Sequence, residues 1–415
     1  MLIPSIDLMN GRAVQLVQGR EKVLERDNPE ELAAQFGRFG RIAVIDLDAA
    51  FGEGDNKALI RRLCVIAECT VGGGIRTVEK AQKMFSYGAA QVILGSRLFE
   101  GGKVDIEFAK SVAAAVGRER VIAAIDAHDG IVTVKGWKES AGLPVADAVA
   151  ALDPYVGGYL FTAVEKEGML QGPAFDRIEA VRALTKKPIT AAGGVTTVAE
   201  VARLDRMGVD AQVGMALYTG KMTPEECFLE TLDWKKAPLI PAITQDEAGQ
   251  VLMLAYMNKE ALAKTLTTGK VTYWSRSRGV LWTKGEASGH CQTFRAIRRD
   301  CDGDALLVTA AQEGPACHTD RYSCFGDRRF SLTELYGVLA ARIASGDAKS
   351  YTAKLSPKEL RQKLLEEAAE VALADDRDNK VWEAADLLYF LTVLLAKEKI
   401  GLDEVMNELQ RRRRK

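Results

Sequence analysis

The chain has 415 residues, which is too long for a single hydrophobic core and therefore predicts two to four domains. Its composition, 47% hydrophobic and 27% charged, is that of a soluble globular protein, and a formal net charge of -1 argues against nucleic acid as a partner. Seven cysteines, no secretory leader at the start and no apolar run of about twenty residues predict a cytoplasmic protein with no membrane partner.

The first part of the chain alternates short apolar runs with longer amphipathic ones, as do parallel strands joined by helices. The predicted strands are residues 3–7, 42–46, 69–72, 91–95, 121–126, 159–162, 188–192 and 211–214. Eight strands in a stretch of this size predict a (β/α)8 TIM barrel over residues 1–235. The chemistry of such a barrel lies at the C-terminal ends of its strands.

The barrel sequence contains an internal repeat. The run I-D-L-M-N-G that begins at Ile6 recurs as I-D-A-H-D-G from Ile125, and G-G-I-R-T-V from Gly73 recurs as G-G-V-T-T-V from Gly193. The offset between the copies is nearly constant. The sequence therefore predicts two four-stranded halves related by duplication.

Each half has glycine-rich turns after its third and fourth strands, where backbone N–H groups and helix N-termini would bind a phosphate. Two phosphate cups would then face each other across the barrel mouth. The cup residues are predicted to be Gly73, Gly74, Arg76, Gly95, Ser96, Gly193, Gly194 and Gly214. Asp7 and Asp126 end the first and fifth strands, on opposite sides of the mouth. One acid and one base suffice for a proton-shuttling isomerisation.

These motifs, with V-I-D-L-D-A-A-F-G and Trp137, resemble phosphoribosylformimino-aminoimidazole-carboxamide ribotide isomerase of histidine biosynthesis over nearly the whole of residues 1–235. The resemblance implies an Amadori-type conversion of an aminoaldose into an aminoketose. It also implies Asp7 as the base and Asp126 as the acid, with Thr162 and Trp137 at positions that hold the substrate.

The chain departs from that family at a few positions. Glu167-Gly168-Met169 replaces the usual Asp-Gly-Thr, Ala163 replaces a frequent aspartate, and Gln15 and Met215 stand where basic residues are common. Lost charges at a phosphate site remove strong hydrogen bonds. An active isomerase remains the favoured hypothesis, and a non-catalytic barrel is the alternative.

A charged seam around Pro238 ends the barrel pattern, and apolar patches at 271–274 and 306–308 predict a compact α+β zinc domain over residues 238–328. This domain carries D-C-D-G-D at 300–304, followed by Cys317-His318 and Cys324. Three cysteine thiolates suit zinc and leave one position for a water, whereas alternating carboxylates suit magnesium. A closed structural zinc site with Cys291 as the fourth ligand is the alternative.

W-S-R-S-R, W-T-K-G-E-A-S-G, D-C-D-G-D-A-L-L and C-H-T followed by S-C-F resemble phosphoribosyl-AMP cyclohydrolase. The resemblance implies a zinc-bound hydroxide that opens the adenine ring and zinc ligands from two subunits, hence a homodimer. His318 stands next to a zinc ligand and is the candidate proton shuttle, with a hydrogen-bonded structural histidine as the alternative. The implied metal ligands are Cys301, Cys317 and Cys324 for zinc and Asp300, Asp302 and Asp304 for magnesium. The residues predicted to bind the purine ribotide are Ser275, Arg276, Ser277, Arg278, Lys284, Glu286 and Ser288.

The helical period dominates residues 331–415, and S-P-K-E at 356–359 predicts a capping box with proline at the first helical position. Five acids in apolar surroundings predict a magnesium cage, because buried carboxylates need a neutralising partner. They are Glu366, Glu367, Glu370, Glu383 and Asp386. The pattern resembles phosphoribosyl-ATP pyrophosphohydrolase, an all-α family. This implies magnesium-assisted release of pyrophosphate, with Lys363 contacting phosphate.

The three resemblances are to consecutive steps of one pathway. The sequence therefore predicts a trifunctional enzyme that acts on small phosphoribosyl nucleotides with zinc and magnesium as cofactors. One alternative is a bifunctional cyclohydrolase and pyrophosphohydrolase whose barrel only binds ligand or mediates dimerisation. Another is a metal-regulated nucleotide-binding protein without hydrolysis. A barrel that isomerises both histidine and tryptophan intermediates is a further variant.

Overall fold

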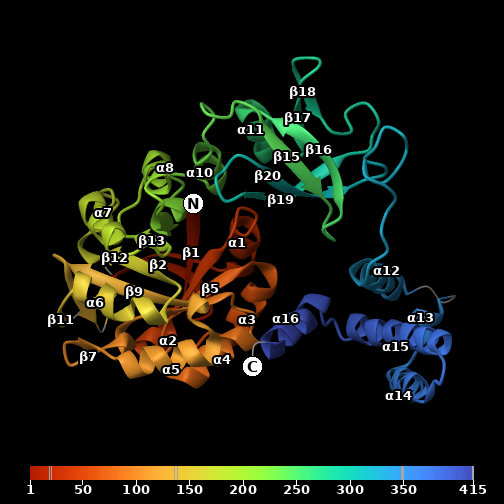
Figure 1. Cartoon of the computed structure of the whole chain (residues 1–415), viewed down its shortest axis with the longest axis horizontal. Helices are drawn as coiled ribbons and strands as arrows, with labels where there is room; N and C mark the ends of the chain where they lie inside the picture. The colour runs from red at the N-terminus through yellow and green to blue at the C-terminus, as the bar shows by residue number, and fades with distance from the viewer. Residues whose placement is uncertain (18, 20, 135, 138, 347–349, 414–415) are drawn as a thin grey trace. The chain divides into compact units, whose positions relative to one another are not determined.

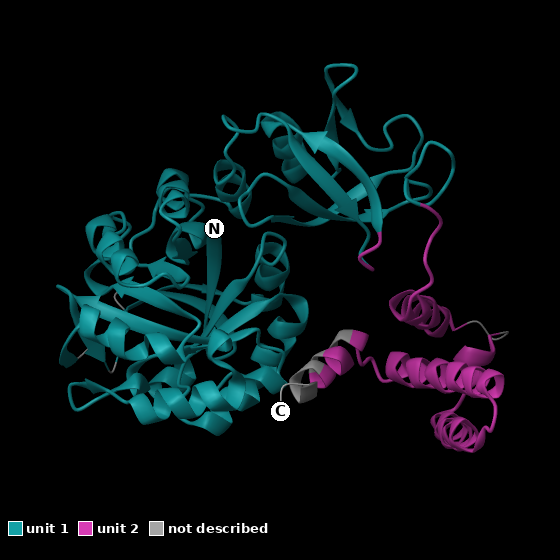
Figure 2. Ribbon diagram, viewed as in Figure 1, with its two compact units in different colours: residues 1–247, 251–325 teal, residues 248–250, 326–415 magenta. Residues whose placement is uncertain are grey.

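The structure is a computed structural model that describes the chain except residues 18, 20, 135, 138, 347–349 and 414–415. It contains two compact units (Figure 2). Unit 1 comprises Met1–Glu247 and Val251–Phe325, and unit 2 comprises Ala248–Gln250 and Gly326–Lys415. The predicted domain boundaries at 235–238 and 328–331 stay predictions. Within the described part of the chain, no helix combines the length and the apolar character that a bilayer crossing demands.

Eight parallel strands of unit 1 close into a barrel (Figure 1). They are β1 (Leu2–Met9), β4 (Ile42–Asp46), β5 (Cys69–Gly72), β6 (Gln91–Leu94), β9 (Val121–His128), β12 (Gly158–Ala163), β13 (Ile189–Ala192) and β14 (Asp210–Val213). Each strand pairs with the next, and the barrel closes where Leu2 of β1 lies opposite Ala211 of β14. The eight predicted strands and the TIM barrel are therefore confirmed.

Helices cover the outside of the barrel. They are α1 (Pro29–Phe36), α2 (Leu47–Phe51), α3 (Lys57–Ile66), α4 (Val78–Ser86), α5 (Ile106–Val116), α6 (Val145–Leu152), α7 (Phe175–Leu184), α8 (Val198–Arg206), α9 (Met215–Tyr218) and α10 (Pro224–Glu230). Short elements complete this part: η1 (Ser96–Leu98), β7 (Phe99–Glu100), β8 (Lys103–Val104), η2 (Arg118–Arg120), η3 (Asp153–Tyr155) and η4 (Val164–Lys166). Apolar residues at helical spacing face the strands, and in α3 they include the buried Ile60 and Leu63.

The internal repeat of the sequence is also a repeat of structure. The first strand of each half continues into an antiparallel hairpin: β2 (Arg12–Val17) with β3 (Glu21–Arg26), and β10 (Ile131–Val134) with β11 (Glu139–Pro144). Asn10 and Asp129 have φ angles of 51° and 49° at the corresponding turns. Gly11 and Gly130 follow and also have positive φ angles. Asn-Gly and Asp-Gly are the pairs that two-residue hairpin turns with left-handed residues favour. Thr77 and Thr197 cap α4 and α8 at matching positions.

A second sheet of six strands forms the rest of unit 1. Its elements are β15 (Ile240–Gln245), β16 (Val251–Met257), α11 (Lys259–Thr268), β17 (Thr272–Ser275), β18 (Val280–Thr283), β19 (Gln292–Arg299) and β20 (Leu306–Gln312). The strand order is β18-β17-β16-β15-β20-β19, with one parallel pair, β15 and β20. Leu262 of α11 and Val308 of β20 are among the fully buried residues of its core.

Unit 2 is all-α, as predicted. Its helices are α12 (Leu332–Ser345), α13 (Tyr351–Lys354), α14 (Pro357–Leu373), α15 (Arg377–Lys397) and α16 (Leu402–Arg413). The Ser356 hydroxyl accepts a hydrogen bond from the backbone N–H of Glu359, and the Glu359 carboxylate accepts one from the N–H of Ser356. The predicted capping box is thus confirmed. Leu339, Leu360 and Phe390 form part of a small core between α12, α14 and α15.

Candidate active sites

Two partly buried carboxyl groups stand on opposite sides of the barrel mouth. Asp7 lies near the carboxyl end of β1 and Asp126 near that of β9, with three strands between them in either direction around the barrel. Burial raises the pKa of Asp7 to about 6, although the Ser5 hydroxyl donates to its Oδ1 at 2.8 Å and opposes the shift. Burial also raises the pKa of Asp126, against hydrogen bonds with Trp137 and Thr162. Near neutral pH, such a pair can take up and release protons.

Trp137 lies over the barrel mouth, between the two hairpins. It has a left-handed backbone with φ of 67°, hydrogen-bonds Asp126, and packs on Gly19 of the β2–β3 turn. A Cβ atom added to Gly19 would lie 2.9 Å from the indole ring, so a glycine is needed there. The ring is therefore placed to cover a ligand that is held between Asp7 and Asp126.

The glycine turns of the first half have the geometry of a phosphate cup. Gly73 and Gly74 have φ angles of 100° and 60°, and added Cβ atoms would lie 2.2 Å and 2.1 Å from the carbonyl oxygens of Asp46 and Ala49. Only glycine fits so close to another backbone. The Arg76 guanidinium donates to the carbonyls of Ala49, at 3.3 Å, and Ala50, at 2.7 Å. Arg76 thus fixes the short helix α2, which follows β4. Gly95 and Ser96 lie after β6, at the start of η1.

The second half has the same turns but different neighbours. Gly193 and Gly194 have φ angles of 95° and 79°. A Cβ atom on Gly193 would lie 3.3 Å from the Glu167 Oε2, and one on Gly214 would lie 2.4 Å from the Gln15 Oε1. Residues that depart from the isomerase pattern, including Gln15 and Glu167, therefore gather at this one cup. The first cup has no such change among the residues compared.

Glu167 is a third carboxyl group close to Asp7 and Asp126. Burial and the negative charges of Asp7 and Asp126 raise its pKa to about 7. The hydroxyl of Tyr218 is also buried, without a hydrogen-bond partner among the described residues, and its pKa is raised by burial and by Asp7. The sequence identified Glu167 only as a departure and gave no role to Tyr218. Both are brought to Asp7 by the closure of the barrel.

Replacing Glu167 with glutamine is expected to stabilise the fold at pH 8 far more than at pH 5. The pKa of Glu167 is about 7 in the folded chain, against an ordinary value of 4.5, so folding takes up a proton between these values. The ionised carboxylate therefore lowers the free energy of unfolding as the pH rises through this window, by on the order of 1 to 3 kcal/mol.

The measurement is the unfolding temperature of both proteins across this pH range. Glu179→Gln, in an exposed ion pair on α7, is the control and should show no such dependence. An equal gain at pH 5 and pH 8 would contradict the burial of Glu167.

Two of the three predicted zinc ligands come together in the sheet domain. Cys317 is buried, and its thiolate is favoured because the hydroxyl and backbone N–H of Thr319 lower its pKa, with a smaller contribution from a hydrogen bond with Cys324. Burial and the neighbouring Cys317 raise the pKa of Cys324. Lys284 is buried beside them. Burial lowers its pKa, while the negative charges of the cysteines oppose this. The soft sulfur donors suit zinc. The Lys284 ammonium beside them would stabilise an anion bound to that metal.

Cys301 does not join this pair within one chain. It is exposed in the turn between β19 and β20, whereas Cys317 and Cys324 follow the far end of β20. A strand of this length spans about 20 Å. Among the described residues, no metal-ligand cluster unites the three sulfurs. A three-cysteine zinc site would therefore need Cys301 of a second copy, and it stays a prediction, as does the homodimer.

The carboxylates of Asp300, Asp302 and Asp304 form a cluster in that same turn. One oxygen of each lies within 4.8 Å of the others, and all three side chains are exposed. The Asp300 Oδ1 accepts hydrogen bonds from the backbone N–H groups of Gly303, Asp304 and Ala305 at 2.9, 3.0 and 3.1 Å. The charges of Asp302 and Asp300 raise the pKa of Asp304. Hard oxygen donors in this arrangement fit magnesium, whose binding remains a prediction.

The predicted ribotide-binding residues lie in two loops. Ser275 to Arg278 form the β17–β18 turn, where Arg276 stacks on the Tyr256 ring at 3.9 Å and Arg278 donates to the Ser275 hydroxyl at 3.1 Å. Glu286 accepts from the backbone of Thr283, and the Ser288 hydroxyl accepts from the backbone of His290. Ser277 and His318 are exposed. Lys284 is the ribotide-binding residue that lies near Cys317 and Cys324, and the candidate proton shuttle His318 follows Cys317 directly.

Four of the five predicted acids of unit 2 converge. One oxygen each of Glu367, Glu383 and Asp386 lies within 4.8 Å of the others, and Glu367 is only 5% exposed. Burial, and next the neighbouring Glu370, raise the pKa of Glu383. Glu366 lies outside that cluster of three and pairs at 3.0 Å with Lys363, which is also 3.6 Å from Glu367. This group of carboxylates fits a divalent cation, since their mutual repulsion needs a counter-charge.

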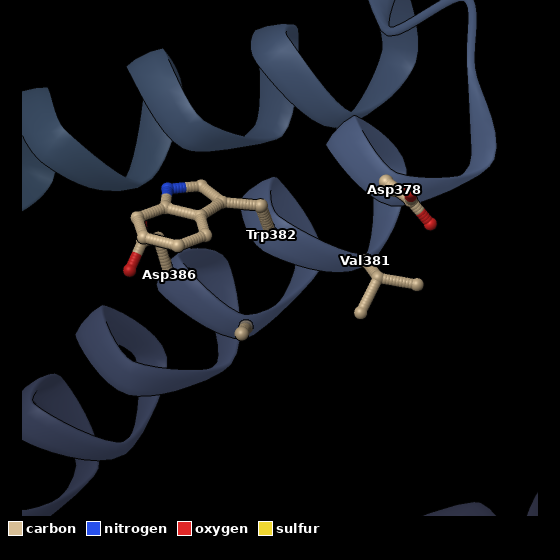
Figure 3. A pocket seen from close by; sticks show the side chains of 5 residues that line it. Asp378, Val381, Trp382 and Asp386 are labelled. Carbon is tan, nitrogen blue, oxygen red and sulfur yellow. The ribbon is translucent and has the colours of Figure 1, made fainter.

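A groove runs along α15 beside these acids (Figure 3). It is lined by Asp378, Val381, Trp382, Ala385 and Asp386. Trp382 is 71% exposed, and its ring lies on the same side of α15 as the Asp386 carboxylate. An exposed indole next to a candidate metal ligand is suited to stacking on a purine base.

Comparisons with known proteins find three families along the chain, in the order that the sequence motifs predict. Residues 1–223 match the family model for histidine biosynthesis protein, 253–326 the model for phosphoribosyl-AMP cyclohydrolase, and 332–413 the model for phosphoribosyl-ATP pyrophosphohydrolase. The chain is 48% identical over 207 residues to the histidine biosynthesis bifunctional protein HisIE of Pyrococcus furiosus, covering 46% of this chain and 99% of that protein. It is 47% identical over 210 residues to HisIE of Wolinella succinogenes, covering 44% and 92%. For HisIE of Bacillus subtilis the identity is 45% over 199 residues, covering 44% and 95%.

Proposed function

Since the chain belongs to the histidine biosynthesis protein family through its barrel, and carries cyclohydrolase and pyrophosphohydrolase domains beyond it, we propose that it is a trifunctional enzyme of histidine biosynthesis. It hydrolyses phosphoribosyl-ATP to phosphoribosyl-AMP and pyrophosphate, opens the adenine ring of phosphoribosyl-AMP, and isomerises the resulting aminoaldose to the aminoketose. The observation that carries this proposal is the presence of all three family segments, for consecutive reactions, in one chain.

The barrel performs the isomerisation between its two carboxyls. Asp126, whose pKa is raised by burial, donates a proton to the ring oxygen of the aminoaldose as the C1–O bond breaks and the amino nitrogen forms a double bond to C1. Asp7, with a pKa of about 6, is largely ionised at neutral pH and removes the proton from C2. The enaminol that forms regains a proton at C1 from the protonated Asp7, and its C2 hydroxyl loses a proton to the Asp126 carboxylate, which gives the ketone and restores both carboxyl groups. Trp137 covers the reacting centre, and the turn at Gly73 and Gly74 holds one phosphate.

The sheet domain opens the adenine ring. Cys317 and Cys324, with Cys301 of the partner subunit, would hold a zinc ion, which when bound supplies hydroxide at neutral pH. His318 is exposed beside Cys317 and moves the proton. Lys284 stabilises negative charge near the sulfurs. The acidic turn at Asp300 to Asp304 would hold magnesium, and the separation of Cys301 from the other two cysteines supports the proposal of a homodimer.

Unit 2 releases pyrophosphate. Glu367, Glu370, Glu383 and Asp386 would hold magnesium, which neutralises the charge of the triphosphate when bound. Lys363 pairs with Glu366 and Glu367 at the edge of this cluster and is within reach of a phosphate that displaces one of these pairs. The exposed Trp382 stacks on the base.

Full-length protein is expected to convert the purified aminoaldose ribotide into the aminoketose, because the barrel retains Asp7, Asp126, Thr162 and an intact first cup. The measurement is the product identity by mass spectrometry and the rate at neutral pH. Folded protein that binds the ribotide without turning it over would favour the alternative in which the barrel is a binding module. Equal turnover of the corresponding anthranilate-derived aminoaldose would instead favour a barrel of double specificity.

A further inference from the structure

The edge strand of the sheet domain is docked on a loop of the barrel. β19 is the last strand of its sheet, and one side of its backbone has no partner strand among the described residues beyond the short bridge of Thr293 to Lys270. The N–H of Ile297 donates to the carbonyl of Arg38 at 2.8 Å, and the Arg38 Nε donates to the carbonyl of Arg295 at 3.3 Å. Arg298 donates to the carbonyls of Gly37, at 3.0 Å, and Arg38, at 2.8 Å. The loop after α1 therefore pairs with the second half of this edge, around Arg295 to Arg298.

Aromatic packing reinforces this contact. Phe39 of the barrel lies in the same hydrophobic cluster as the core of the sheet domain, with ring centroids 5.8 Å from Phe228 of α10 and 6.5 Å from Phe294 of β19. The Arg38 guanidinium lies 4.5 Å above the Phe294 ring. These three rings are buried. The two folds of unit 1 consequently share part of their core.

The end of β19 is held by a partly buried ion pair. The guanidinium of Arg299 donates to both oxygens of Asp205, at 2.8 and 2.5 Å, and to the carbonyl of Thr231 at 3.0 Å. The side chains are only 18% and 11% exposed. Burial alone would raise the pKa of Asp205, but the hydrogen bonds from Arg299 and the charge of the α-amino group hold it below its ordinary value. A bidentate pair of this kind fixes direction as well as distance.

Arg299 is followed immediately by the acidic turn. The carboxylate of Asp300 accepts the three backbone hydrogen bonds that shape this turn, and the carboxylates of Asp302 and Asp304 converge on it. Asp205 lies at the end of α8, the helix that leads back to the start of β14, away from the barrel mouth. It can therefore influence the turn without touching Asp7 or Asp126.

We propose that Asp205 of the barrel is a positioning residue for the cyclohydrolase reaction: through Arg299 it fixes the end of β19 and thereby the turn that carries Asp300, Asp302 and Asp304. The expected effect of Asp205 on the rate of hydrolysis rests on the proposed function. Its expected effect on the structure of the acidic turn rests on geometry alone. The barrel then serves as a rigid support for a reaction that takes place in another domain.

The test is Asp205→Asn in the full chain, with two measurements. Hydrolysis of phosphoribosyl-AMP is expected to fall roughly 10-fold in kcat/KM, the size typical of a residue that orients metal ligands, while the rates of pyrophosphate release and isomerisation stay unchanged. Hydrogen exchange at the amides of Gly303 to Ala305 is expected to become about 10-fold faster, because the turn loses its anchor. Asp205→Glu keeps the charge and should restore most of both properties.

Glu179→Gln removes a charge from an exposed pair with Arg203 of α8, the helix that carries Asp205, and should change neither measurement. Arg299→Lys is the second variant, for the case in which Asp205→Asn does not fold. It keeps the positive charge but loses the bidentate contact, so smaller changes in kcat/KM and in hydrogen exchange are expected. Unchanged exchange in the turn of a folded Asp205→Asn protein overturns the proposal. If wild-type protein does not hydrolyse phosphoribosyl-AMP, the proposed function fails, and the exchange measurement still decides the role of Asp205.

Discussion

Replacing Cys317 with serine is expected to lower the rate of phosphoribosyl-AMP hydrolysis by about 10^3-fold or more, because a neutral hydroxyl cannot hold the zinc ion that lowers the pKa of water. Zinc content, measured by plasma mass spectrometry after dialysis, should fall in parallel. Pyrophosphate release depends on the separate acids around Glu367 and should be unaffected. Cyclohydrolase activity that survives in the zinc-free Cys317→Ser protein would contradict the assignment.

Cys291→Ser provides the matched comparison. Cys291 is close enough to Lys284 to affect its pKa, and it is the fourth cysteine that a closed structural site would need. We expect this variant to keep its zinc and its cyclohydrolase activity. Loss of zinc in both variants, with a loss of folding, would favour the structural site.

The same cysteines test the homodimer. Cys301→Ser and Cys317→Ser chains should each be inactive as cyclohydrolases, because each lacks one ligand at every site. After the two are mixed and allowed to exchange subunits, about a quarter of the sites should regain all three sulfurs, since half of the dimers are mixed and each has one complete site. Mixtures that exchange subunits but stay inactive would show that the zinc ligands do not come from two copies.

Replacing Asp7 with asparagine is expected to lower isomerisation by about 10^3-fold, since an amide cannot accept the proton from C2 of the substrate. The fold should be retained or stabilised at neutral pH, because burial disfavours the ionised Asp7 carboxylate. Asp129→Asn is the control, since Asp129 is exposed at the hairpin after β9 and pairs with Arg177. An Asp7→Asn protein with more than about a tenth of the wild-type rate would exclude Asp7 as the base.

Features set by local sequence could be predicted well. The strands of the barrel follow from short apolar runs, and the repeat of Gly73-Gly74 at Gly193-Gly194 follows from backbone conformations that only glycine adopts easily. The capping box at Ser356 is likewise a local interaction between neighbouring residues. In each case the determining contacts lie within a few residues or follow a regular period.

Features set by distant contacts could not be predicted. Glu167 and Tyr218 meet Asp7 because the barrel closes, which no local pattern indicates. Cys301 is near Cys317 in sequence but at the opposite end of β20 in the fold. Glu366 was grouped with the other acids, yet adjacent helical residues point about 100° apart, so Lys363 contacts both Glu366 and Glu367 while only Glu367 belongs to the cluster with Glu383 and Asp386.

The docking of β19 on the barrel is the clearest case of this kind. Arg38, Phe39 and Asp205 belong to no recognisable motif. Their role arises from the contact between two domains whose sequences resemble separate families. Only the structure places Asp205 beside Arg299. The sequence predicted the three domains but gave no means of predicting which surfaces join the first two.

The most direct test of the trifunctional account is to supply phosphoribosyl-ATP to the full-length chain with zinc and magnesium and to follow all ribotides over time by mass spectrometry. The account predicts that pyrophosphate and phosphoribosyl-AMP form first, that the ring-opened aminoaldose follows, and that the aminoketose becomes the final product. Accumulation of the aminoaldose without further conversion would contradict the claim that the barrel is an active isomerase. No release of pyrophosphate at all would contradict the whole scheme.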